Sequence, residues 1–340
     1  MKTDRILLDH GSGGVASRNL IENIFLPRLD NPALAQFEDS AIVTAGSTRL
    51  AFTTDGYVVD PIFFPGGDIG KLAVHGTIND LAMQGAYPLC LSLSLILEEG
   101  FAIADLERIA DSIAQASQES GIPVVTGDTK VVHRGKADKI FITTSGIGIV
   151  PGKLALGSGK ARPGDAVLLS GYMGDHGITV MAARSGLAMQ SAIKSDTAPL
   201  HRMVADLLQN VPEAVRCLRD PTRGGVATVL SEIAVKSKVC IEINEDRLPV
   251  RPVVGTACEM LGLDPLYLAN EGKCLVIADK GAAESLLSIM RRTREGRDAV
   301  LIGRVAQPEA GRGGRVILKT GIGGTRIIGP LSGEPLPRIC

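Results

Sequence analysis

The sequence contains no tryptophan, and aromatic residues make up only 3% of its 340 residues. Proteins that bind single-stranded nucleic acids stack the bases on aromatic side chains, which are scarce here. An excess of positive charge is also missing, because 36 Lys and Arg residues face 37 Asp and Glu residues and the net charge is −1. Nucleic acids and anionic membrane surfaces attract proteins that carry such an excess. The composition therefore argues against both kinds of partner.

Long hydrophobic runs are missing as well. The longest stretch without a charge lies between Asp80 and Glu98, contains Gly85 and Pro88, and then alternates as "LSLSL". A period of two indicates a β-strand and not a membrane helix. The first residues, "MKTDRILLDHGSGG", lack the apolar core of a secretion signal. We therefore expect a cytoplasmic protein without a membrane segment.

Metal-binding cysteine patterns are absent too. The chain has six cysteines, but no two of them form a C-x-x-C pair, and none has the spacing of zinc ligands. In a cytoplasmic protein such scattered thiols stay reduced. A structural zinc site is excluded on these grounds, and a disulfide framework is not expected.

The chain does have many glycines, 40 in all, and 45% hydrophobic residues, which is the composition of a globular protein. Patterns typical of strands and helices alternate in both halves, so the fold class is α/β or α+β with two lobes of similar size. The predicted strands lie near 41–45, 49–54, 89–97, 123–126, 139–149, 166–170, 239–243, 274–278, 299–305 and 315–319. The predicted helices lie near 18–25, 69–84, 103–118, 176–186, 200–209, 223–236, 252–261 and 281–293.

A stretch rich in Gly, Pro and Lys, "PGKLALGSGKARPGD", separates the halves at 151–165. We expect four parts: a glycine-rich N-terminal segment at 1–40, an N-terminal domain at 41–155, a C-terminal domain at 156–330, and a mobile tail at 331–340.

Several aspartates stand at the ends of predicted elements and not on helix faces. A carboxylate that follows an apolar strand points into the crevice beyond the sheet edge, where α/β proteins bind ligands. Carboxylate oxygens suit Mg²⁺, which commonly bridges to phosphates. Any single one of these residues is equally well explained as a turn or helix-capping residue. As a set, beside Lys71 and Lys130, they favour nucleotide binding: Asp39, Asp55, Asp60, Asp68, Asp80, Asp128 and Asp220.

The usual phosphate motifs are missing. Lys71 follows a glycine as in a P-loop, but Pro65 replaces the required first glycine and Leu72 replaces the Ser or Thr that holds Mg²⁺. No G-x-G-x-x-G lies between a strand and a helix with an acid after it. Ordinary P-loop and Rossmann folds are therefore not expected.

The last residues, "SGEPLPRIC", end in Cys340. A prenylation signal needs its cysteine four places from the end, so this tail is not one. Pro335 and Pro337 favour an extended lead and prevent helix formation. The alternatives left open are a frayed terminus and a thiol that is used chemically.

Five segments of the chain resemble the HypE family of hydrogenase maturation proteins, within the superfamily of aminoimidazole ribonucleotide synthetase, selenophosphate synthetase and thiamine-monophosphate kinase. The resemblance covers nearly the whole chain. It rests on "TTDGYVVDPIFFPGGDIGKLAVHGTINDLAMQGAYPL" (53–89), "VVTGDTKVV" (124–132), "LRDPTRGGVA" (218–227), "NEG" (270–272) and the ending "PRIC".

The resemblance implies a two-lobed fold of the aminoimidazole ribonucleotide synthetase type. Its N-terminal lobe, 41–155, would bind ATP and form a dimer β-barrel, and an α/β lobe would follow. By motif match, Mg²⁺ would be held by Asp39, Asp55, Asp80 and Asp220, and ATP by Lys71, Asn79, Asp128 and Thr129. The chain departs from the family at Glu38-Asp39, where relatives often have two aspartates.

The resemblance also implies a reaction. The S-carboxamide on Cys340 would be dehydrated to an S-cyanide while ATP is cleaved to ADP and phosphate. Glu271 and Lys130 are the candidates for the base that removes the N–H proton, although Lys130 is equally well explained as a phosphate contact. The partners would be the carbamoyltransferase HypF as donor of the carboxamide and the HypC–HypD complex as acceptor of the cyanide, which becomes a ligand of the iron in [NiFe] hydrogenase.

Two other functions remain open at this point. One is a small-molecule synthetase of the same superfamily, of the purine or selenophosphate type. A selenophosphate enzyme would carry a reactive Cys or selenocysteine in its N-terminal glycine loop, and "HGSGG" has neither. The other is a non-enzymatic scaffold that binds nucleotide and docks a partner through the tail.

Overall fold

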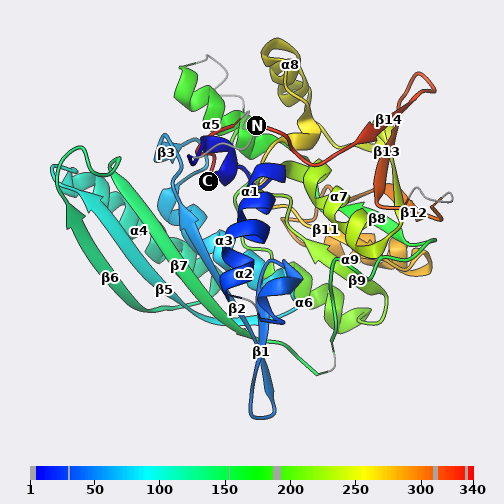
Figure 1. Ribbon diagram of the computed structural model, residues 1–340, viewed down its shortest axis with the longest axis horizontal. Helices are drawn as coiled ribbons and strands as arrows, with labels where there is room; N and C mark the ends of the chain where they lie inside the picture. The colour runs from blue at the N-terminus through cyan, green and yellow to red at the C-terminus, as the bar shows by residue number, and fades with distance from the viewer. Residues whose placement is uncertain (1–4, 30, 153, 187–192, 309–312, 334–335) are drawn as a thin grey trace.

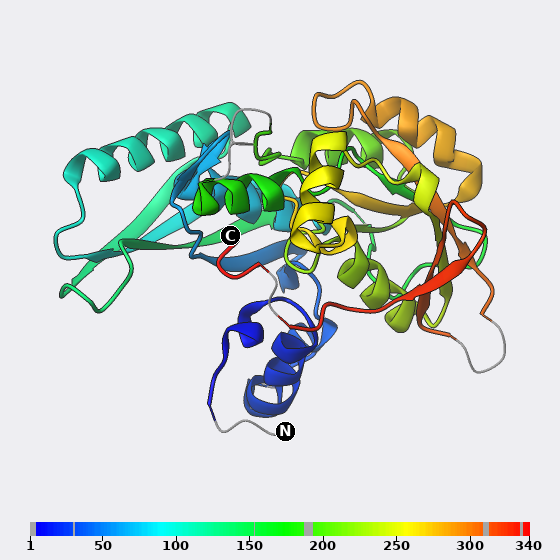
Figure 2. The ribbon, with the colours of Figure 1, turned by 90° about the horizontal axis from the view of Figure 1, so that it is seen from above.

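The computed structural model describes residues 5–29, 31–152, 154–186, 193–308, 313–333 and 336–340. Two domains lie side by side, each built on one large sheet, and the N-terminal segment crosses between them (Figure 1, Figure 2). The first sheet ends at Ile149 and the second begins at Ala166. The predicted boundary between 155 and 156 falls in the connection between them.

The N-terminal domain is a five-stranded sheet in the order β1-β2-β7-β5-β6. Only β5 and β6 run parallel, because helix α4 connects them. Helices α3 and α4 cover one face of the sheet, and the other face carries no helix (Figure 1). The strands are β1 (Ala41–Ala45), β2 (Thr48–Tyr57), β5 (Tyr87–Glu98), β6 (Val124–Val132) and β7 (Ile140–Ile149), and the helices are α3 (Ile69–Met83) and α4 (Ile103–Ser120).

Helix α3 is buried on nearly all sides because it lies between the two domains. Asp68 caps its start by accepting hydrogen bonds from the N–H groups of Gly70 and Lys71, at 2.8 and 3.0 Å. The polar side chains of His75 and Asn79 on this helix are each only 1% exposed. Asn79 accepts from the N–H of Leu200 at 2.8 Å, so the helix is tied to the C-terminal domain.

The C-terminal domain is a seven-stranded sheet in the order β14-β13-β10-β12-β8-β11-β9. Its central strands read "AVLL" and "LVIA" and are buried on both faces, which explains why they are apolar throughout. Helix α7 packs on one face, and α6 and α9 pack on the other. The strands are β8 (Ala166–Leu169), β9 (Val215–Arg219), β10 (Cys240–Asn244), β11 (Leu275–Ala278), β12 (Val300–Ala306), β13 (Arg315–Lys319) and β14 (Thr325–Ile328). The helices are α5 (Asp175–Ser185), α6 (His201–Asn210), α7 (Gly225–Ser237), α8 (Pro252–Leu261) and α9 (Ala283–Met290).

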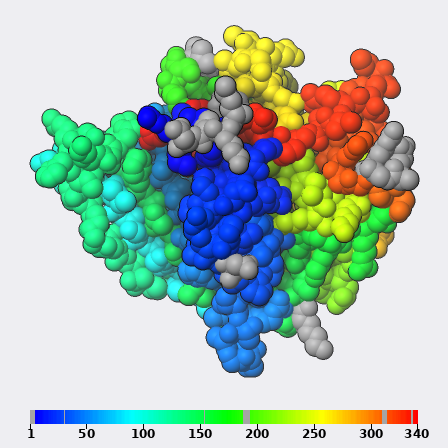
Figure 3. Space-filling model, in the orientation of Figure 1, coloured from blue at the N-terminus to red at the C-terminus, as the bar shows by residue number. Residues whose placement is uncertain are grey.

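The N-terminal segment contains α1 (Val15–Leu20), a π-helical stretch (Ile21–Phe25) and α2 (Leu26–Leu29). It lies across the front of the molecule, over the junction of the two domains (Figure 3). Lys236 of α7 holds its end by donating to the carbonyls of Gln36 and Phe37 at 2.6 and 2.8 Å. None of the helices in the described residues combines the length and the apolar character that a membrane span requires.

The tail folds back onto the molecule. Residues 336–340 lie between helix α5 and the segment that follows β2, close to the N-terminal segment (Figure 2). Leu336 and Ile339 are buried, and Cys340 packs against the same apolar core. Pro335 lies outside the described residues. This docked arrangement differs from a freely extended lead, and movement of the tail stays a prediction.

Candidate active site

Four of the predicted acidic residues converge where the two domains meet. Asp55 lies near the end of β2, Asp80 lies on α3, Asp220 directly follows β9, and Asp39 precedes β1. The Thr53 hydroxyl lies 2.8 Å from Asp80 Oδ2 and 3.0 Å from the carbonyl oxygen of Asp39. Two elements and two connecting segments, from both halves of the chain, therefore supply a single cluster of carboxylates, which we call the acid cluster.

The carboxylates of the acid cluster repel one another. Burial raises the pKa of Asp80 well above its usual value, and the neighbouring charges of Asp55, Asp220 and Asp39 raise it further. Burial likewise raises the pKa of Asp220 to about 6, although the Arg219 guanidinium opposes the change. Such an excess of negative charge is unfavourable by itself, and a bound cation would offset it.

Asp39 is held differently from the other three. Its Oδ1 lies 2.7 Å from Nε of Arg219, which also pairs with Glu232 at 3.3 Å. Glu38, the preceding residue, accepts from Lys236 at 3.2 Å. Asp39 Oδ2 is buried without a hydrogen-bond partner in the described part of the chain. One oxygen of Asp39 is thus used to fix the protein, and the other is left for a ligand.

Glu271 borders the acid cluster and is 4% exposed. Its pKa is raised well above the usual value, first by burial and then by the charges of Asp220, Asp196 and Asp55. Among the described residues nothing hydrogen-bonds its Oε1. A side chain on Gly272 would meet the carbonyl oxygen of Asp196 at 1.9 Å, so only glycine permits this loop to approach so closely. A buried carboxylate of raised pKa is suited to accept a proton.

The docked tail brings Cys340 to the same place. The N–H of Val58, three residues after Asp55, donates to the carbonyl oxygen of Cys340 at 2.9 Å. Arg223 Nη1 donates to the carbonyl of Gly11 at 3.0 Å. The negative charge of Cys340 is the largest cause that raises the pKa of Arg223, followed among the acids by Asp55 and Glu271. The charges of Cys340, Asp55 and Glu271 therefore all act on one guanidinium.

Two of the residues predicted to line an ATP site lie on α3. Lys71 is partly exposed, and its Nζ donates only a long bond, 3.3 Å, to the carbonyl of Gly66. The amide of Asn79 is fully engaged, because its Nδ2 donates to the carbonyls of Ala198 and Glu271 at 3.0 and 3.3 Å. In this structure Asn79 positions the Glu271 loop. Its contact with ATP, like that of Lys71, stays a prediction.

Asp128, Thr129 and Lys130 are not brought to the acid cluster. They lie on β6, at the sheet edge, where Lys130 pairs with Asp128 at 2.7 Å and both side chains are more than half exposed. The register runs from Gly56 through Thr143 and Ser94 to Asp128, so three strand spacings separate β2 from β6. At roughly 4.8 Å between neighbouring strands, this is about 14 Å. Asp128 also projects from the open face, opposite to that of Asp55.

The acid cluster could supply only some of the ligands that Mg²⁺ needs. No three His, Cys, Asp or Glu side chains within the described ranges are arranged to hold a metal ion by themselves. Mg²⁺, however, is usually bound by one or two carboxylates together with waters and phosphates. The unpartnered Asp39 Oδ2 and the mutual repulsion of the carboxylates match that requirement.

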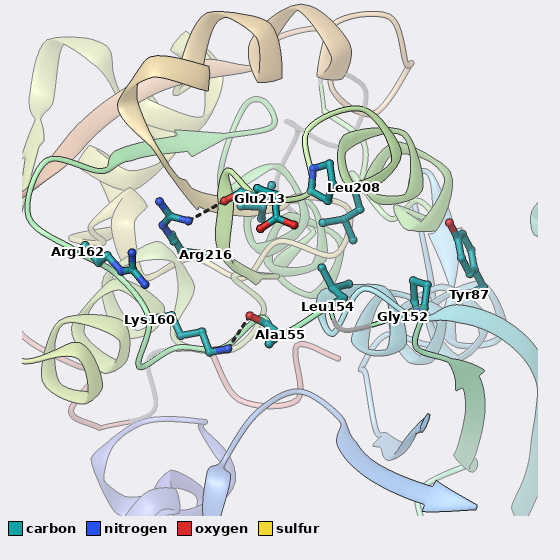
Figure 4. A pocket seen from close by; sticks show the side chains of 12 residues that line it. Tyr87, Gly152, Leu154, Ala155, Lys160, Arg162, Leu208, Glu213 and Arg216 are labelled. Atoms are coloured by element: carbon teal, nitrogen blue, oxygen red, sulfur yellow. Dashed lines mark hydrogen bonds between the residues drawn. The ribbon is translucent and has the colours of Figure 1, made fainter. Parts of the chain in front are cut away.

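A separate cavity of about 460 Å³ lies at the junction of the domains (Figure 4). Lys160, Arg162 and Arg216 line it, and Arg216 donates to the carbonyl of Glu213 at 2.7 Å. None of the predicted site residues lines this cavity, so it is distinct from the acid cluster.

Sequence reasoning missed three contributors to the site. Arg223 stands within the quoted "LRDPTRGG" motif, and its side-chain type is the signal that was available. Tyr57 lies 3.3 Å from Asp55 Oδ2 through its hydroxyl, and burial raises its pKa. His176 on α5 contacts the tail through Nε2, 2.8 Å from the carbonyl of Ile339. The last two depend on contacts between segments far apart in the sequence.

Comparison with known proteins agrees with this architecture. The model of the N-terminal domain of AIR synthase related proteins matches residues 37–150, and the model of their C-terminal domain matches 162–315. Carbamoyl dehydratase HypE of Cupriavidus necator is 52% identical over 343 residues, which span 100% of this chain and 96% of that protein.

Solved structures are similar over nearly the whole chain. A structure of hydrogenase maturation protein HypE in complex with ATP has a TM-score of 0.83 at 49% identity, covering 99% of this chain and 100% of the other. A HypE–HypF complex has a TM-score of 0.86 at 46% identity, covering 92% of this chain and 99% of the other. The chain belongs to the AIR synthase related proteins and, within them, to the HypE family of carbamoyl dehydratases.

Proposed function

We propose that this chain is an ATP-dependent carbamoyl dehydratase that acts on its own tail. It converts an S-carboxamide on Cys340 into an S-cyanide and cleaves ATP to ADP and phosphate. The observation that carries the proposal is the placement of Cys340, whose carbonyl oxygen accepts from Val58 beside the acid cluster. A small-molecule synthetase would have no use for a thiol brought to this position by its own tail.

ATP is the phosphoryl donor in this proposal, as in the ATP-bound HypE relative. Its triphosphate would lie against the acid cluster through Mg²⁺, held by Asp39, Asp55, Asp80 and Asp220. When bound, the ion neutralises the charge that develops on the transferred phosphoryl group. Lys71, at the partly exposed start of α3, would contact a phosphate, and Asn79 would act through the Glu271 loop that it holds.

The first step activates the carboxamide. Its oxygen attacks the γ-phosphorus of ATP, ADP leaves, and the amide oxygen becomes part of a phosphate ester that departs readily. Arg223 is placed to stabilise the negative charge of the phosphoryl group. The docked tail supplies the orientation, since Leu336 and Ile339 anchor it in the apolar core.

The second step completes the removal of protons from nitrogen. One N–H proton is lost to solvent when the amide oxygen is phosphorylated, which gives an iminophosphate. A base takes the second N–H proton as the C–O bond to phosphate breaks and the C≡N bond forms. Glu271 is the base in this proposal, because its pKa is raised and its Oε1 is buried without a partner among the described residues. Lys130 is too far away on its own chain for this role, at the roughly 14 Å spanned by three strand spacings. It would reach the reaction only from a second subunit.

A homodimer would provide that second subunit. The open face of the N-terminal sheet carries exposed apolar side chains, among them Phe52 and Ile147, which lie opposite each other on β2 and β7. Exposed apolar patches of this kind mark protein interfaces. Pairing of two open faces would form the expected barrel and bring Asp128, Thr129 and Lys130 of one chain toward the acid cluster of the other. A monomer in sedimentation at micromolar concentration would contradict this.

The remaining partners follow from the chemistry. The carboxamide must be supplied by a carbamoyltransferase, HypF, whose relative forms a complex with HypE. The cyanide would pass to a HypC–HypD complex and then to the iron of [NiFe] hydrogenase. None of the six cysteines is in a disulfide, and the reaction needs a reduced thiol, so the cytoplasm is the proposed compartment.

Intact mass of the C-terminal peptide tests the proposal. Incubation with the carbamoylating partner should add one carboxamide to Cys340, and addition of ATP should then remove the mass of one water. Cys340→Ala should give no product but should still bind ATP, because the acid cluster does not include this side chain. Cys340→Ser should also fail, since a hydroxyl is a far weaker nucleophile at neutral pH. A mass change on another cysteine would overturn the proposal.

A further inference from the structure

Main-chain hydrogen bonds tie the docked tail to the segment that follows β2. The N–H of Val58 donates to the carbonyl of Cys340 at 2.9 Å, and the N–H of Asp60 donates to the carbonyl of Arg338 at 3.2 Å. The residue numbers rise on one side and fall on the other, so the tail runs antiparallel to the 58–60 segment. Arg338 has a φ of 52°, in the left-handed region, and residues 337–338 form a turn, so the tail curls along this segment and is not a β-strand.

Helix α5 closes the other side of this groove. Arg184 donates from Nη2 to the carbonyl of Arg338 at 2.9 Å and from Nε to the carbonyl of Asp60 at 2.8 Å, so it joins the tail to its neighbour. His176 Nε2 lies 2.8 Å from the carbonyl of Ile339. A carbonyl only accepts, so Nε2 carries the proton. All three carbonyl groups from 338 to 340 are therefore held.

Side chains add contacts that depend on the sequence of the tail. Arg338 forms an ion pair with Asp138 in the loop before β7, and its Nε donates to the carbonyl of Val58 at 2.8 Å. Ile339 is 4% exposed and Leu336 is 6% exposed, both within the core cluster that includes Phe64 of the N-terminal domain and Ile178 of α5. Arg338 is partly exposed at the rim, whereas the two apolar residues fill the floor.

We propose that the 58–60 segment, Asp138 and helix α5 form a peptide groove that recognises Leu336, Arg338 and Ile339, and that the Asp138–Arg338 pair fixes the register of the tail. The inference rests on the proposed function and adds the specificity of its substrate segment. Asp138, Arg184 and His176 are positioning residues, since they contact the tail and not the reacting atoms.

Register matters because the main-chain contacts alone accept any sequence. A slip of one residue would move the Cys340 thiol by up to about 3.8 Å, which is the spacing of successive Cα atoms. Misplacement by about 1 Å already costs on the order of a hundredfold in rate when reacting groups must be aligned. After a slip, Ile339 would lose its buried site and Arg338 would lose Asp138. The side-chain contacts thus select the one alignment that presents Cys340 to the acid cluster.

A charge exchange tests the proposal in the full-length protein. Arg338→Glu places two acids side by side and should slow ATP-dependent dehydration of the carbamoylated protein about tenfold. Combining it with Asp138→Arg should restore at least half of the loss, because the pair is re-formed with reversed signs. Asp111→Arg, a charge reversal on the exposed surface of α4, is the matched control and should have no effect.

Alkylation of Cys340 by iodoacetamide measures docking without partner or ATP. The half-buried thiol should react several-fold faster in Arg338→Glu and in Arg184→Gln, and the exchanged pair should return toward the wild-type rate. If the exchanged pair is no better than Arg338→Glu in both measurements, or if Arg338→Glu leaves both unchanged, the proposal is overturned. If no cyanide forms in any variant but alkylation follows the expected order, the groove stands and the proposed function fails.

Discussion

The acid cluster and strand β6 carry similar motifs, but the fold treats them in opposite ways. The acid cluster combines Asp39, Asp55, Asp80 and Asp220 at the domain junction, where their charges are mutually close. Strand β6 carries Asp128 and Lys130, which pair with each other, and Asp128 on the open face also accepts from the N–H of Thr129. The buried carboxylates of the acid cluster repel one another, and this repulsion is unfavourable for folding. Asp128 and Lys130 are exposed to solvent and carry opposite charges.

This difference indicates which part of the site a single chain can form by itself. Burial of like charges is costly, and proteins retain such clusters where a ligand relieves them. An exposed ion pair such as Asp128–Lys130 has little effect on folding stability, and it remains accessible to a second subunit. We therefore interpret the acid cluster as the part that holds Mg²⁺–ATP within one subunit and β6 as the part that is contributed across a dimer interface.

The largest effect is expected from the acid cluster. Asp80→Asn removes a carboxylate that hydrogen-bonds Thr53 and faces three other acids, so ATP turnover should fall by on the order of a thousandfold through loss of metal binding. Asp55→Asn should behave alike. Phosphate release measures the effect, and circular dichroism checks the fold. Turnover within twofold of wild type in both variants would remove the acid cluster from the mechanism.

A mixed dimer would show whether β6 acts across the dimer interface or within its own chain. Asp80→Asn and Lys130→Ala are each expected to inactivate, but a dimer of one of each chain would have one site with both elements intact if β6 acts across the interface. Equal mixing makes half of the dimers mixed, and each has one working site of two, so turnover should recover to about a quarter of wild type. If β6 acts within its own chain, the mixture should stay inactive.

The sequence predicted elements well where a regular pattern was unopposed. Helix α3, predicted at 69–84, is Ile69–Met83, and the strand predicted at 89–97 is Tyr87–Glu98. A strand was predicted near 123–126, but strand β6 begins at Val124 and extends to Val132. Gly127 allows this, since a side chain there would meet the carbonyl of Leu93 at 2.4 Å on the neighbouring strand.

Strand β9 was missed because of its two arginines. A five-residue strand reading "VRCLR" has the pattern of a surface segment, yet Arg219 is only 11% exposed and pairs with Asp39 and Glu232. These acids come from distant parts of the sequence, so burial of the arginine depends on tertiary structure. Only Asp220 directly follows a strand, and Asp80 lies within α3 and not at an element end, so the acid cluster was predicted from the family motifs and not from the position of each acid. The docking of the tail beside it was not predicted, because nothing local relates Arg338 to Asp138.

Replacement of Asp220 by Asn is expected to have a smaller effect. It should raise folding stability, although it should lower activity. Burial raises the pKa of Asp220 from 3.8 to about 6, so between these values the folded state binds more protons than the unfolded state. Stability then falls as pH rises through this window. At pH 8 the penalty is complete, about 3 kcal/mol at most for this shift. Asp220→Asn should therefore unfold at higher urea concentration than wild type at pH 8 without nucleotide.

The gain from Asp220→Asn should be much smaller at pH 4 and should shrink to nothing below about pH 3, where both states of the wild-type residue are protonated. Equal gains at pH 4 and pH 8 would mean that charge repulsion is not the cause. A loss of stability at pH 8 would contradict the description of the acid cluster as strained by its own charge.

The smallest effect on folding stability is expected at β6. Lys130→Ala breaks a pair whose two side chains are 68% and 58% exposed, and exposed pairs contribute little to stability. Its free energy of unfolding should therefore stay close to that of wild type, at pH 8 and at pH 4 alike, and 1 M salt should erase any difference because exposed charges are screened. Dehydration of the carbamoylated tail should nevertheless be impaired in the same preparation. A site completed by a second subunit requires a residue of this kind, which is needed for turnover but not for the fold of its own chain. A large loss of stability in Lys130→Ala would instead mean that the Asp128–Lys130 pair stabilises the fold.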